Sequence, residues 1–515
     1  MEQKPCSKRQ LCVRQLTIAL ADVSGSRYAG AASQNNNKAS LCCSGNAQII
    51  IRTSKKNKNW LAEWEKPRFS HFLLYAVNLM AHHRVKFHSY MNVDYRTKTS
   101  IPSEQISINA LKVIRRLTEH GYEAYVVGGG VRDLILGRRP KDFDVATNAH
   151  PKEVHELFRN SRMIGKRFKI VHIRFGRDII EVATFRAARN ESKKNIDIED
   201  RGQLNQTESG MLLADNVYGA FEEDVFRRDF TINALYYDPE ECKIIDFVRG
   251  REDLKKQVIR LIGEPESRYR EDPVRMLRAI RFKAMLGFTI DEASSDPMYE
   301  LGYLLQDIST ARLFEELIKL FMSGYAAKVF DDLLRYDLFG WLFPDSRRVM
   351  EKYPAEKLIR AALDSTDRRI AEDLPVTPAF IYASLLWYPF VEEKKRLEEG
   401  GASYVEASNE AAANILAKQQ LFTSIPRRFS VPMRDIWYLQ FRLPNRHGKK
   451  AKALVRHKRF RAAYDFLLLR ELAGEKLDNL GEWWTNYQDA DETERQTMKP
   501  KPTRGRRRRP LERRI

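Results

Sequence analysis

The stretch that most constrains this chain lies between Val126 and Asp144 and has the sequence VVGGGVRDLILGRRPKDFD. The apolar run 124–127 predicts a buried strand, and the three glycines after it form a backbone that can lie against a phosphate group because it lacks Cβ atoms. Asp142 and Asp144 follow a turn and stand two residues apart. Side chains at i and i+2 of a strand share a face, so both carboxylates are expected to bind the same pair of divalent cations.

Neither half of this pattern is specific alone, because glycine triplets and Asp-x-Asp pairs also occur in ordinary loops. Together they resemble the nucleotidyltransferase signature of the bacterial poly(A) polymerase and CCA-adding enzyme family. A Rossmann loop is disfavoured because paired aspartates stand where one ribose-binding acid would be needed. The resemblance implies ATP as substrate, two Mg²⁺ ions held by Asp142 and Asp144, and nucleotide contacts from Gly128, Gly129 and Arg132.

The charge of the chain points to a polyanionic partner. Its 515 residues include 89 Lys and Arg against 69 Asp and Glu, a net charge of +20. Nucleic acid fits this excess better than a membrane, since no amphipathic or membrane-spanning segment accompanies it. Five cysteines without a CxxC pair, and histidines without zinc spacing, predict a cytoplasmic protein with no structural metal.

Residues 1–100 lack sustained hydrophobic periodicity and predict a poorly ordered extension without its own core. Three explanations stay open: a start assigned upstream of a true beginning near Met80 or Met91, a cleaved targeting segment, or a disordered basic arm. We favour the first, because no amphipathic Arg-rich helix is present. A chain starting at Met91 is then expected to fold and react as the full one does.

Regular patterns begin after residue 100. We expect an amphipathic helix over 106–120, a helix over 151–160, a hairpin of strands 170–175 and 179–185, and a mobile loop over 187–210. Helices dominate from residue 229 onward, apart from a strand-like segment at 243–248.

A third catalytic carboxylate is expected on a strand next to the aspartate pair. Glu181 is the first candidate, because its segment is apolar enough for a central strand, where a buried acid needs a reason. The alternative role for Glu181 is an ion pair with Arg186. Asp229 is the other candidate for the third carboxylate, and the sequence leaves the choice between them open.

A second block, Arg-Arg-Asp-Phe-Thr-x-Asn-Ala-Leu at 227–235, resembles the second signature of the same family. The resemblance implies that Arg227 and Arg228 bind the triphosphate, which suits guanidinium geometry. It implies that Asp229 and Asn233 position the nucleotide. The residues alone also permit Asp229 as the N-cap of a helix over 230–237, with the arginines on a solvated face.

The segment 267–282 predicts one helix with Pro273 in its first turn and with Glu271, Asp272 and Arg275 on one face. Spacing alone would suit a salt-bridged surface helix. The Glu-Asp-x-x-Arg motif in the family selects the base of the incoming nucleotide without a template. The resemblance implies that role for Glu271, Asp272 and Arg275.

The C-terminal half is helical and ends in two basic segments. We expect two amphipathic helices over 309–345 and further helices over 350–482. The segment 446–461 has eight basic residues and no acid, and 499–515 has nine basic residues and one acid. Both predict contacts with RNA phosphates, the second as a disordered tail. The expected RNA-binding residues are Lys449, Lys450, Arg456, Lys458, Arg459, Arg506, Arg507, Arg508 and Arg509.

The resemblance covers about residues 101–473 and implies an α+β fold with a small mixed β-sheet head and an α-helical neck and body. The expected domains are an extension over 1–100, a head over 101–240, a neck over 241–345, a body over 346–482 and a disordered tail over 483–515.

Within the family, the segment 163–173 and the basic body resemble the poly(A) polymerase subgroup. We therefore expect a monomeric enzyme that adds adenylates to RNA 3′ ends with release of pyrophosphate, promotes RNA turnover and meets RNA-decay proteins. CCA addition to tRNA is the alternative. A non-catalytic RNA-binding protein is the third reading, disfavoured by the intact Asp142, Asp144, Arg227 and Arg228.

Overall fold

The computed structural model describes residue 101 and residues 103–165, 169–187, 217–446 and 448–498. At Ser103, at Gln496 and in short strands outside these ranges, only the backbone is described. The chain divides into two compact units, 1–93 and 94–515. The first contains an antiparallel sheet in the order β1-β4-β3-β2, formed by Thr17–Ala19, Gln48–Arg52, Lys38–Cys42 and Ala31–Asn35.

Three predictions fall mainly outside the described residues. They are the extension without a core over 1–100, the mobile loop over 187–210 and the basic tail from 499 onward. The disordered tail was expected to begin at residue 483, and this part of the prediction is wrong because Leu480–Asp489 and Glu492–Thr497 are helices. The described parts of the loop region are Ala187 and the short strands β11 (Leu204–Gln206) and β12 (Leu212–Asp215).

The second unit begins with a head built on an eight-stranded mixed sheet, in the order β5-β14-β13-β6-β7-β10-β9-β8. β7 and β10 are parallel, and the other neighbouring pairs are antiparallel. The strands are β5 Arg96–Lys98, β6 Ala124–Val127, β7 Asp144–Thr147, β8 Ser161–Ile164, β9 Ile170–Phe175, β10 Asp178–Thr184, β13 Tyr236–Asp238 and β14 Lys243–Ile245. β14 lies just beyond the expected end of the head at residue 240.

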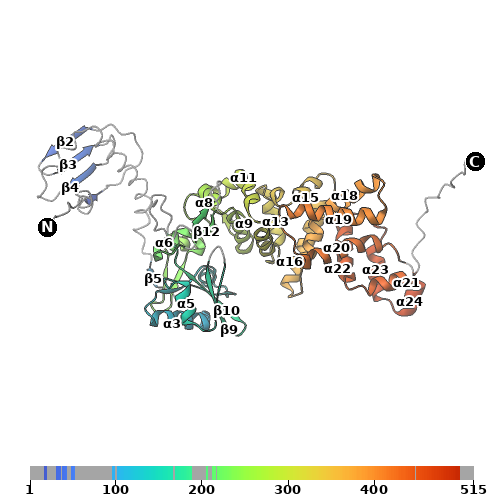
Figure 1. Cartoon of the computed structure of the whole chain (residues 1–515), viewed down its shortest axis with the longest axis horizontal. Coiled ribbons are helices and arrows are strands. Elements are labelled where there is room, and N and C mark those ends of the chain that lie inside the picture. Colours follow the sequence, from blue (N-terminus) through green and yellow to red (C-terminus); the bar gives the residue numbers. More distant parts are fainter. Residues whose placement is uncertain are drawn as a thin grey trace, which may run out of the picture. The chain divides into compact units, whose positions relative to one another are not determined.

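Two helices pack on one face of this sheet, α3 (Ile108–Glu119) and α5 (Pro151–Leu157). Ser107 caps α3, its side chain accepting from the backbone N–H groups of Asn109 and Ala110, and the apolar stripe of α3 is buried. The amphipathic helix, the first strand and the hairpin predicted from the sequence are therefore confirmed (Figure 1).

Two local predictions in the head are wrong. Asp142 lies in the loop before β7 rather than in the strand, so only Asp144 projects from the sheet. The expected helix over 230–237 is instead a short 3₁₀ turn, η3 (Thr231–Asn233), followed by β13. The β-branched and aromatic residues of 230–237 suit a strand. Residues 236–238 form β13 because they pair with β6 and β14.

The neck and body are helical. The expected single helix over 267–282 is wrong, because it is broken into α8 and α9 at Asp272, whose φ of −150° is extended, before Pro273. The helices are α4 Gly129–Ile135, α6 Phe221–Arg227, α7 Gly250–Lys256, α8 Pro265–Glu271, α9 Val274–Leu286, α10 Glu292–Ser295, α11 Pro297–Leu301, α12 Thr310–Phe321, α13 Ala326–Arg335, α14 Phe339–Leu342, α15 Pro344–Val349, α16 Ala355–Ala371, α17 Pro378–Leu385, α18 Trp387–Glu399, α19 Tyr404–Gln420, α20 Arg427–Arg442, α21 Gly448–Val455, α22 Phe460–Leu472, α23 Leu480–Asp489 and α24 Glu492–Thr497. A 3₁₀ turn, η4, covers Gly302–Asp307, another, η2, covers Ser103–Gln105, and a two-strand ladder joins β15 (Val258–Ile259) to β16 (Thr289–Ile290).

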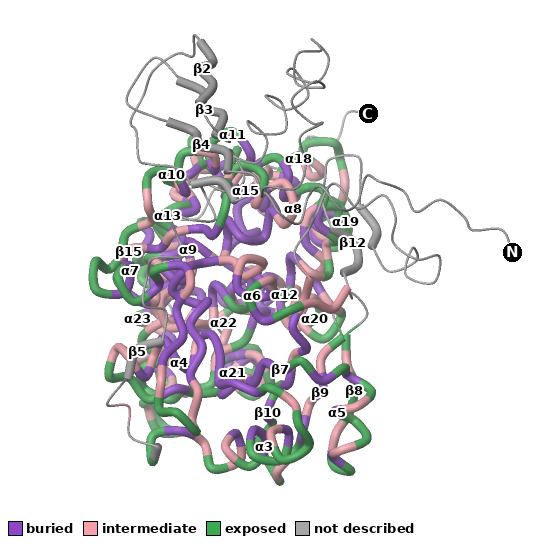
Figure 2. The backbone as a smooth tube through the Cα atoms, turned by 90° about the vertical axis from the view of Figure 1, so that its left-hand side faces the viewer, coloured by how far each residue is buried: buried purple, intermediate pink, exposed green. Residues whose placement is uncertain are grey.

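One continuous hydrophobic core joins head, neck and body, from Ile106 before α3 to Ala473 after α22 (Figure 2). In the body, the rings of Phe390 and Trp437 are nearly parallel at 4.5 Å, which adds to the burial of both. Among the described residues, every helix is too short or too polar to cross a bilayer.

Gly250 is the point at which α7 approaches η3 most closely. A Cβ atom at Gly250 would lie 2.2 Å from the backbone oxygen of Thr231. We predict that Gly250→Ala lowers the free energy of unfolding by about 1–3 kcal/mol, because the clash is with backbone and cannot be relieved by a rotamer change. Thermal unfolding followed by circular dichroism measures the loss. Gly340→Ala is the control, since the nearest atom to its Cβ is 3.7 Å away; equal melting temperatures for the two variants would contradict the prediction.

Candidate functional site

The glycine turn after β6 is held against the loop that carries Asp142. Gly128 has φ +76°, a conformation that favours glycine, and its N–H donates to the carbonyl of Leu235. A Cβ on Gly130 would lie 3.3 Å from the carbonyl oxygen of Asp142 and 3.4 Å from the Phe143 ring. The two halves of the sequence signature therefore meet in space through backbone contact.

Three polar residues form a row across neighbouring strands on one face of the sheet. Glu181 of β10 is the register partner of Asp144 on β7 and of His172 on β9. The Nε2 of His172 lies 3.0 Å from Oε1 of Glu181. Because an ionised carboxylate only accepts hydrogen bonds, this Nε2 carries the proton. Glu181 was expected to be buried, but its side chain is 50% exposed, and its ion-pair partner is His172 rather than Arg186.

The donor set at this row fits a hard divalent cation. Burial raises the pKa of Asp144 to about 6, helped by Glu181 and Asp142 and opposed by Arg228 and His172. Carboxylates that disfavour one another's charge are stabilised by a cation between them, and carboxylate oxygens suit Mg²⁺. Within the described residues, no group of three His, Cys, Asp or Glu side chains is already gathered for one ion. Asp144 and Glu181 are adjacent, and Asp142 lies on the neighbouring loop.

Arg228 is anchored beside the glycine turn. Its Nε donates to the hydroxyl of Tyr236 at 2.7 Å and its Nη2 to Asp224 at 3.0 Å, and Tyr236 donates to the same Asp224 oxygen at 2.6 Å. Burial opposes the charge of Arg228, but Tyr236 and Asp224 hold its pKa above the usual range. The Nη1 of Arg228 would be 3.9 Å from a Cβ on Gly128, which places a fixed positive charge at the turn.

Arg227 points elsewhere, with its Nη1 donating to the carbonyl of Ala187 at 2.8 Å. The sequence analysis predicted the same role for Arg227 and Arg228. In the structure their side chains bind different groups. Asp224 and Tyr236 were not predicted. The spacing of four residues between Asp224 and Arg228, typical of charge pairs on helices, was the available signal for Asp224.

A chain of polar contacts links the head to the neck. Arg132 donates from Nη1 to the side-chain oxygen of Asn233 at 2.9 Å, and the amide of Asn233 donates to Asp229 at 3.4 Å. Arg278 of α9 completes the chain with an ion pair to Asp229 at 2.6 Å. Burial alone would raise the pKa of Asp229, but Arg278, the backbone N–H of Phe230 and Arg275 lower it to about 2. Asp229 is thus tied to an arginine, which favours Glu181 as the third carboxylate.

The three motif residues at the break between α8 and α9 each have a protein partner. The Nη1 of Arg275 donates to Glu271 at 2.9 Å and to the carbonyl of Arg268 at 2.5 Å. Asp272 accepts from Nη2 of Arg312 on α12 at 2.7 Å. Asp272 and Arg275 are therefore held by different residues. Both lie near the start of α9, the helix that also carries Arg278.

Arg281, which sequence reasoning did not single out, lies in one cluster with Arg132 and Arg278. The guanidinium groups of Arg132, Arg278 and Arg281 lie 5.4, 5.5 and 4.9 Å from the ring centre of Phe282. Burial and the neighbouring Arg278 lower the pKa of Arg281, whose buried Nε has no hydrogen-bond partner among the described residues. Its spacing of three from Arg278 and six from Arg275 was the available signal. The cluster suits an anionic ligand.

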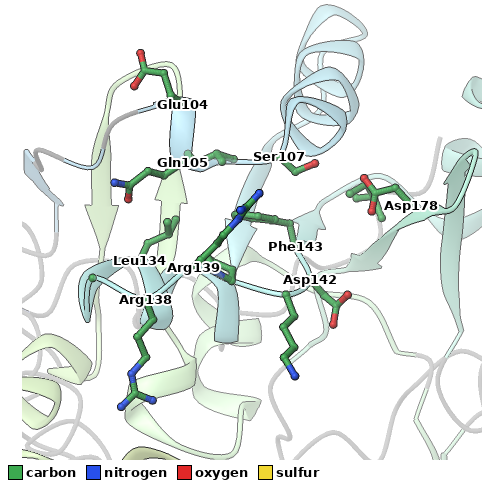
Figure 3. A pocket seen from close by; sticks show the side chains of 14 residues that line it. Glu104, Gln105, Ser107, Leu134, Arg138, Arg139, Asp142, Phe143 and Asp178 are labelled. Carbon is green, nitrogen blue, oxygen red and sulfur yellow. The ribbon is translucent and has the colours of Figure 1, made fainter. Parts of the chain in front are cut away.

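A pocket of about 560 Å³ lies next to this site but is separate from it. It is lined by the loop 137–143, by residues 104–107 before α3, and by Leu134, Asp178 and Ile180 (Figure 3). Asp142 borders it, whereas Asp144, Glu181 and Arg228 are not among its lining residues. Ile180 belongs to the core on the α3 side of the sheet, so the pocket opens on the opposite face from the carboxylate row.

The predicted RNA-binding segment 446–461 forms α21 and the start of α22. Lys449, Lys450, Arg456 and Lys458 are exposed and Arg459 is half-buried, and none of them has an ion pair within the described part of the chain. Leu454 and Phe460, expected from the sequence to form the inner face together with Val455, are buried; Val455 is half-buried, and Ala451 is buried as well. Arg506, Arg507, Arg508 and Arg509 lie outside the described residues.

Comparison with known families gives three matches along the chain. The model described as "Poly A polymerase head domain" matches residues 124–260. "Probable RNA and SrmB- binding site of polymerase A" matches 287–350, and "Polymerase A arginine-rich C-terminus" matches 400–515.

Curated relatives include both branches named above. Poly(A) polymerase I of Escherichia coli is 47% identical over 399 residues, covering 76% of this chain and 85% of that protein. The same enzyme of Haemophilus influenzae is 44% identical over 424 residues, covering 80% and 92%. The CCA-adding enzyme of Lactobacillus helveticus is 36% identical over 251 residues, covering 48% and 59%.

Among solved structures, the Thermotoga maritima CCA-adding enzyme complexed with tRNA aligns with a TM-score of 0.52 at 19% identity, covering 77% of this chain and 87% of that one. A CCA-adding enzyme in an apo form aligns with the same score at 21% identity, covering 76% and 86%. At this identity the likeness concerns the fold alone. The expected α+β architecture of sheet head and helical body is confirmed.

The contact between His172 and Glu181 predicts that His172 orients the Glu181 carboxylate. His172→Leu removes the donor, so we predict that kcat falls about three- to tenfold, equivalent to roughly 0.7–1.4 kcal/mol, with little change in KM for the nucleotide. His172→Gln carries an amide donor of similar reach and should restore most of the rate. Arg174→Leu, two residues along β9, controls for an added apolar side chain. Equal losses for Leu and Gln at 172, or a change confined to KM, would remove His172 from this role.

Proposed function

Since this chain belongs to the family that contains the bacterial poly(A) polymerases and the CCA-adding enzymes, it is an RNA nucleotidyltransferase, and we propose that it adds adenylates to RNA 3′ ends. The substrates are ATP and an RNA 3′ hydroxyl, and the products are the extended RNA and pyrophosphate. The resulting tails serve RNA turnover in this proposal.

One observation supports the proposal most directly: the carboxylates of Asp144 and Glu181 lie next to the glycine turn that follows β6. Asp144 and Glu181 are register partners on β7 and β10, and the turn at Gly128 follows β6, the strand on the other side of β7. Asp142, Asp144 and Glu181 would hold two Mg²⁺ ions, which when bound polarise the phosphoryl oxygens and activate the attacking hydroxyl. Gly128 and Gly129 allow close approach of the triphosphate, and Arg228 neutralises its charge.

The chain from Arg132 to Arg278 positions the rest of the nucleotide. Arg132 and Asn233 are buried and hydrogen-bonded to each other, so their orientations are set before substrate binds. Such preorganisation avoids the cost of ordering these groups during binding. Arg278 and Arg281 face the same region from α9, and Arg281 provides an unsatisfied donor for a phosphate oxygen.

The fixed setting of Asp272 and Arg275 supports a preference for one base. Arg312 holds Asp272, and Glu271 holds one corner of the Arg275 guanidinium. Adenine and cytosine each present an amino donor beside a ring-nitrogen acceptor, so two anchored side chains favour the base whose size matches their separation. The Escherichia coli poly(A) polymerase I aligns with 76% of this chain at 47% identity, whereas the Lactobacillus helveticus CCA-adding enzyme aligns in sequence with 48% at 36% identity.

The first test removes a metal-binding carboxylate. We predict that Asp144→Asn and Asp142→Asn abolish pyrophosphate release, at least a 10³-fold loss of kcat, while RNA affinity stays within about twofold, because these groups hold cations rather than polynucleotide. Asp178→Asn, an exposed acid at the start of β10, is the matched control. Near-normal rates in the Asp144 variant at saturating Mg²⁺ would refute the assignment.

The second test separates the two branches of the family. Each NTP is offered separately with an unstructured oligoribonucleotide and with tRNA lacking its 3′ end. We predict many additions of AMP to the oligonucleotide and poor use of CTP, with the preference reduced about five- to hundredfold by Arg275→Ala, as for loss of a bidentate base contact of ~1–3 kcal/mol. Addition of C, C and A confined to tRNA would assign the chain to the CCA-adding branch.

A further inference from the structure

Helix α20 presents a stripe of basic and aromatic side chains on its outer side. Arg427, Val431, Arg434, Tyr438 and Arg442 follow one another at spacings of four, three, four and four residues, which places them on one helix face. Arg427 and Arg442 are exposed, Val431 is 45% exposed, and Arg434 and Tyr438 are half-buried. The opposite face, with Met433, Ile436 and Trp437, is buried in the body.

Among the residues that the structure describes, the cations of this stripe have no acidic partners. Arg434 donates to the hydroxyl of Tyr438 at 3.1 Å, and Arg428 lies over Phe429 at 4.8 Å. In the described part of the chain, none of the four arginines of α20 forms an ion pair, although Arg360, Lys395 and Arg396 on neighbouring body helices all do. Asp435 is the single acid of α20. Uncompensated guanidinium groups beside a tyrosine ring match the chemistry of a single-stranded nucleic acid, which needs cations for its phosphates and aromatic faces for its bases.

The ends of α20 lie beside two parts of the site already described. At the N-terminal end, Phe429 packs against Phe314 of α12 at 5.8 Å, and the N–H of Ser424 donates to the carbonyl of Thr310. Two residues along α12, Arg312 holds Asp272 of the base-selecting motif. At the C-terminal end, α20 is followed directly by the basic segment 446–461.

From this arrangement we propose that the outer face of α20 is a track for the single-stranded 3′ region of the acceptor RNA, running from the basic segment 446–461 to the base-selecting motif. Arg427, Arg434 and Arg442 contact successive phosphates, and a base stacks on Tyr438. Sixteen residues of helix extend about 24 Å, enough to align several nucleotides. The inference rests on the proposed function, since it assigns a path to the RNA substrate of that reaction.

The occupant is a single strand rather than a duplex or a protein. A duplex is bound mainly through its backbone and shape, and it leaves no base free to stack on Tyr438. An acidic protein surface would also satisfy the arginines, but the proposed function already requires this chain to bind a single-stranded RNA end. The duplex is tested directly in the experiment below, and RNA binding that is unchanged in the track variant would point to a protein instead.

The experiment measures binding of a fluorescent, unstructured oligoribonucleotide to the full chain as a function of salt. The triple variant Arg427→Ala, Arg434→Ala, Arg442→Ala is compared with Lys352→Ala, Arg360→Ala, Arg396→Ala, which removes the same charge from exposed positions already paired with carboxylates. Because each phosphate contact on a single strand contributes about 0.7 to the slope of log affinity against log salt, the track variant should lose about 2 units of slope and the control little. Circular dichroism verifies that both triples are folded.

Tyr438 separates stacking from charge. Tyr438→Ala should weaken binding about fivefold or more, whereas Tyr438→Phe keeps the ring and should bind as the unmodified chain does. Equal salt slopes for the two triple variants, or equal losses for Ala and Phe at 438, would overturn the track. So would a duplex RNA that shows the same losses as the single strand. Pyrophosphate release from ATP by the unmodified chain reports on the proposed function separately, so the track can fail while that function stands, and the reverse.

Discussion

The buried ion pair between Asp229 and Arg278 is the interaction on which the head and neck both depend. The side chain of Asp229 is 13% exposed, and a carboxylate in that position is costly unless it is paired and hydrogen-bonded. Arg278, the N–H of Phe230 and the amide of Asn233 together meet that requirement. The pair therefore ties α9 to the segment just before η3, where Phe230 also packs against Phe282 of α9. Arg132 joins through Asn233, and the nucleotide region is thereby assembled by packing rather than by substrate.

The sequence predicted the elements whose signal is local. The amphipathic stripe of α3, the apolar run of β6 and the glycine turn depend on neighbouring residues, and the structure has them as expected. The errors arose where long-range contacts decide. Residues 236–238 have a helix-compatible pattern in isolation but become β13 because β6 and β14 supply ladder partners. Glu181 looked buried because its strand is apolar, yet period-two alternation turns its side chain to the open face while Ile180 and Val182 enter the core.

Site residues followed the same division. Asp144, Arg228, Asp272 and Arg275 were found through motifs. Arg281 and His172 were not predicted, because neither belongs to one of these motifs. Only the fold shows that Arg281 lies in a cluster with Arg132 and that His172 contacts Glu181. Asp224 was not predicted either, because it accepts hydrogen bonds from both Arg228 and Tyr236 and thereby holds Arg228 in place. Sequence reasoning thus identifies residues that belong to recognisable motifs more readily than residues that hold other side chains in place.

The parallel register of β7 and β10 has a consequence for how defective molecules are removed. Glu181 meets Asp144 in the same alignment that sends Ile180, Val182 and Val145 into the core. A slip of β10 by one residue would turn Glu181 away and move Ile180 and Val182 out of the core at once. Such a molecule would be unstable, and unstable molecules are cleared by cellular proteases in proportion to their unfolded population. Misaligned copies therefore do not accumulate as folded, inactive competitors for RNA. A single error in strand register both displaces Glu181 from Asp144 and lowers the stability of the fold.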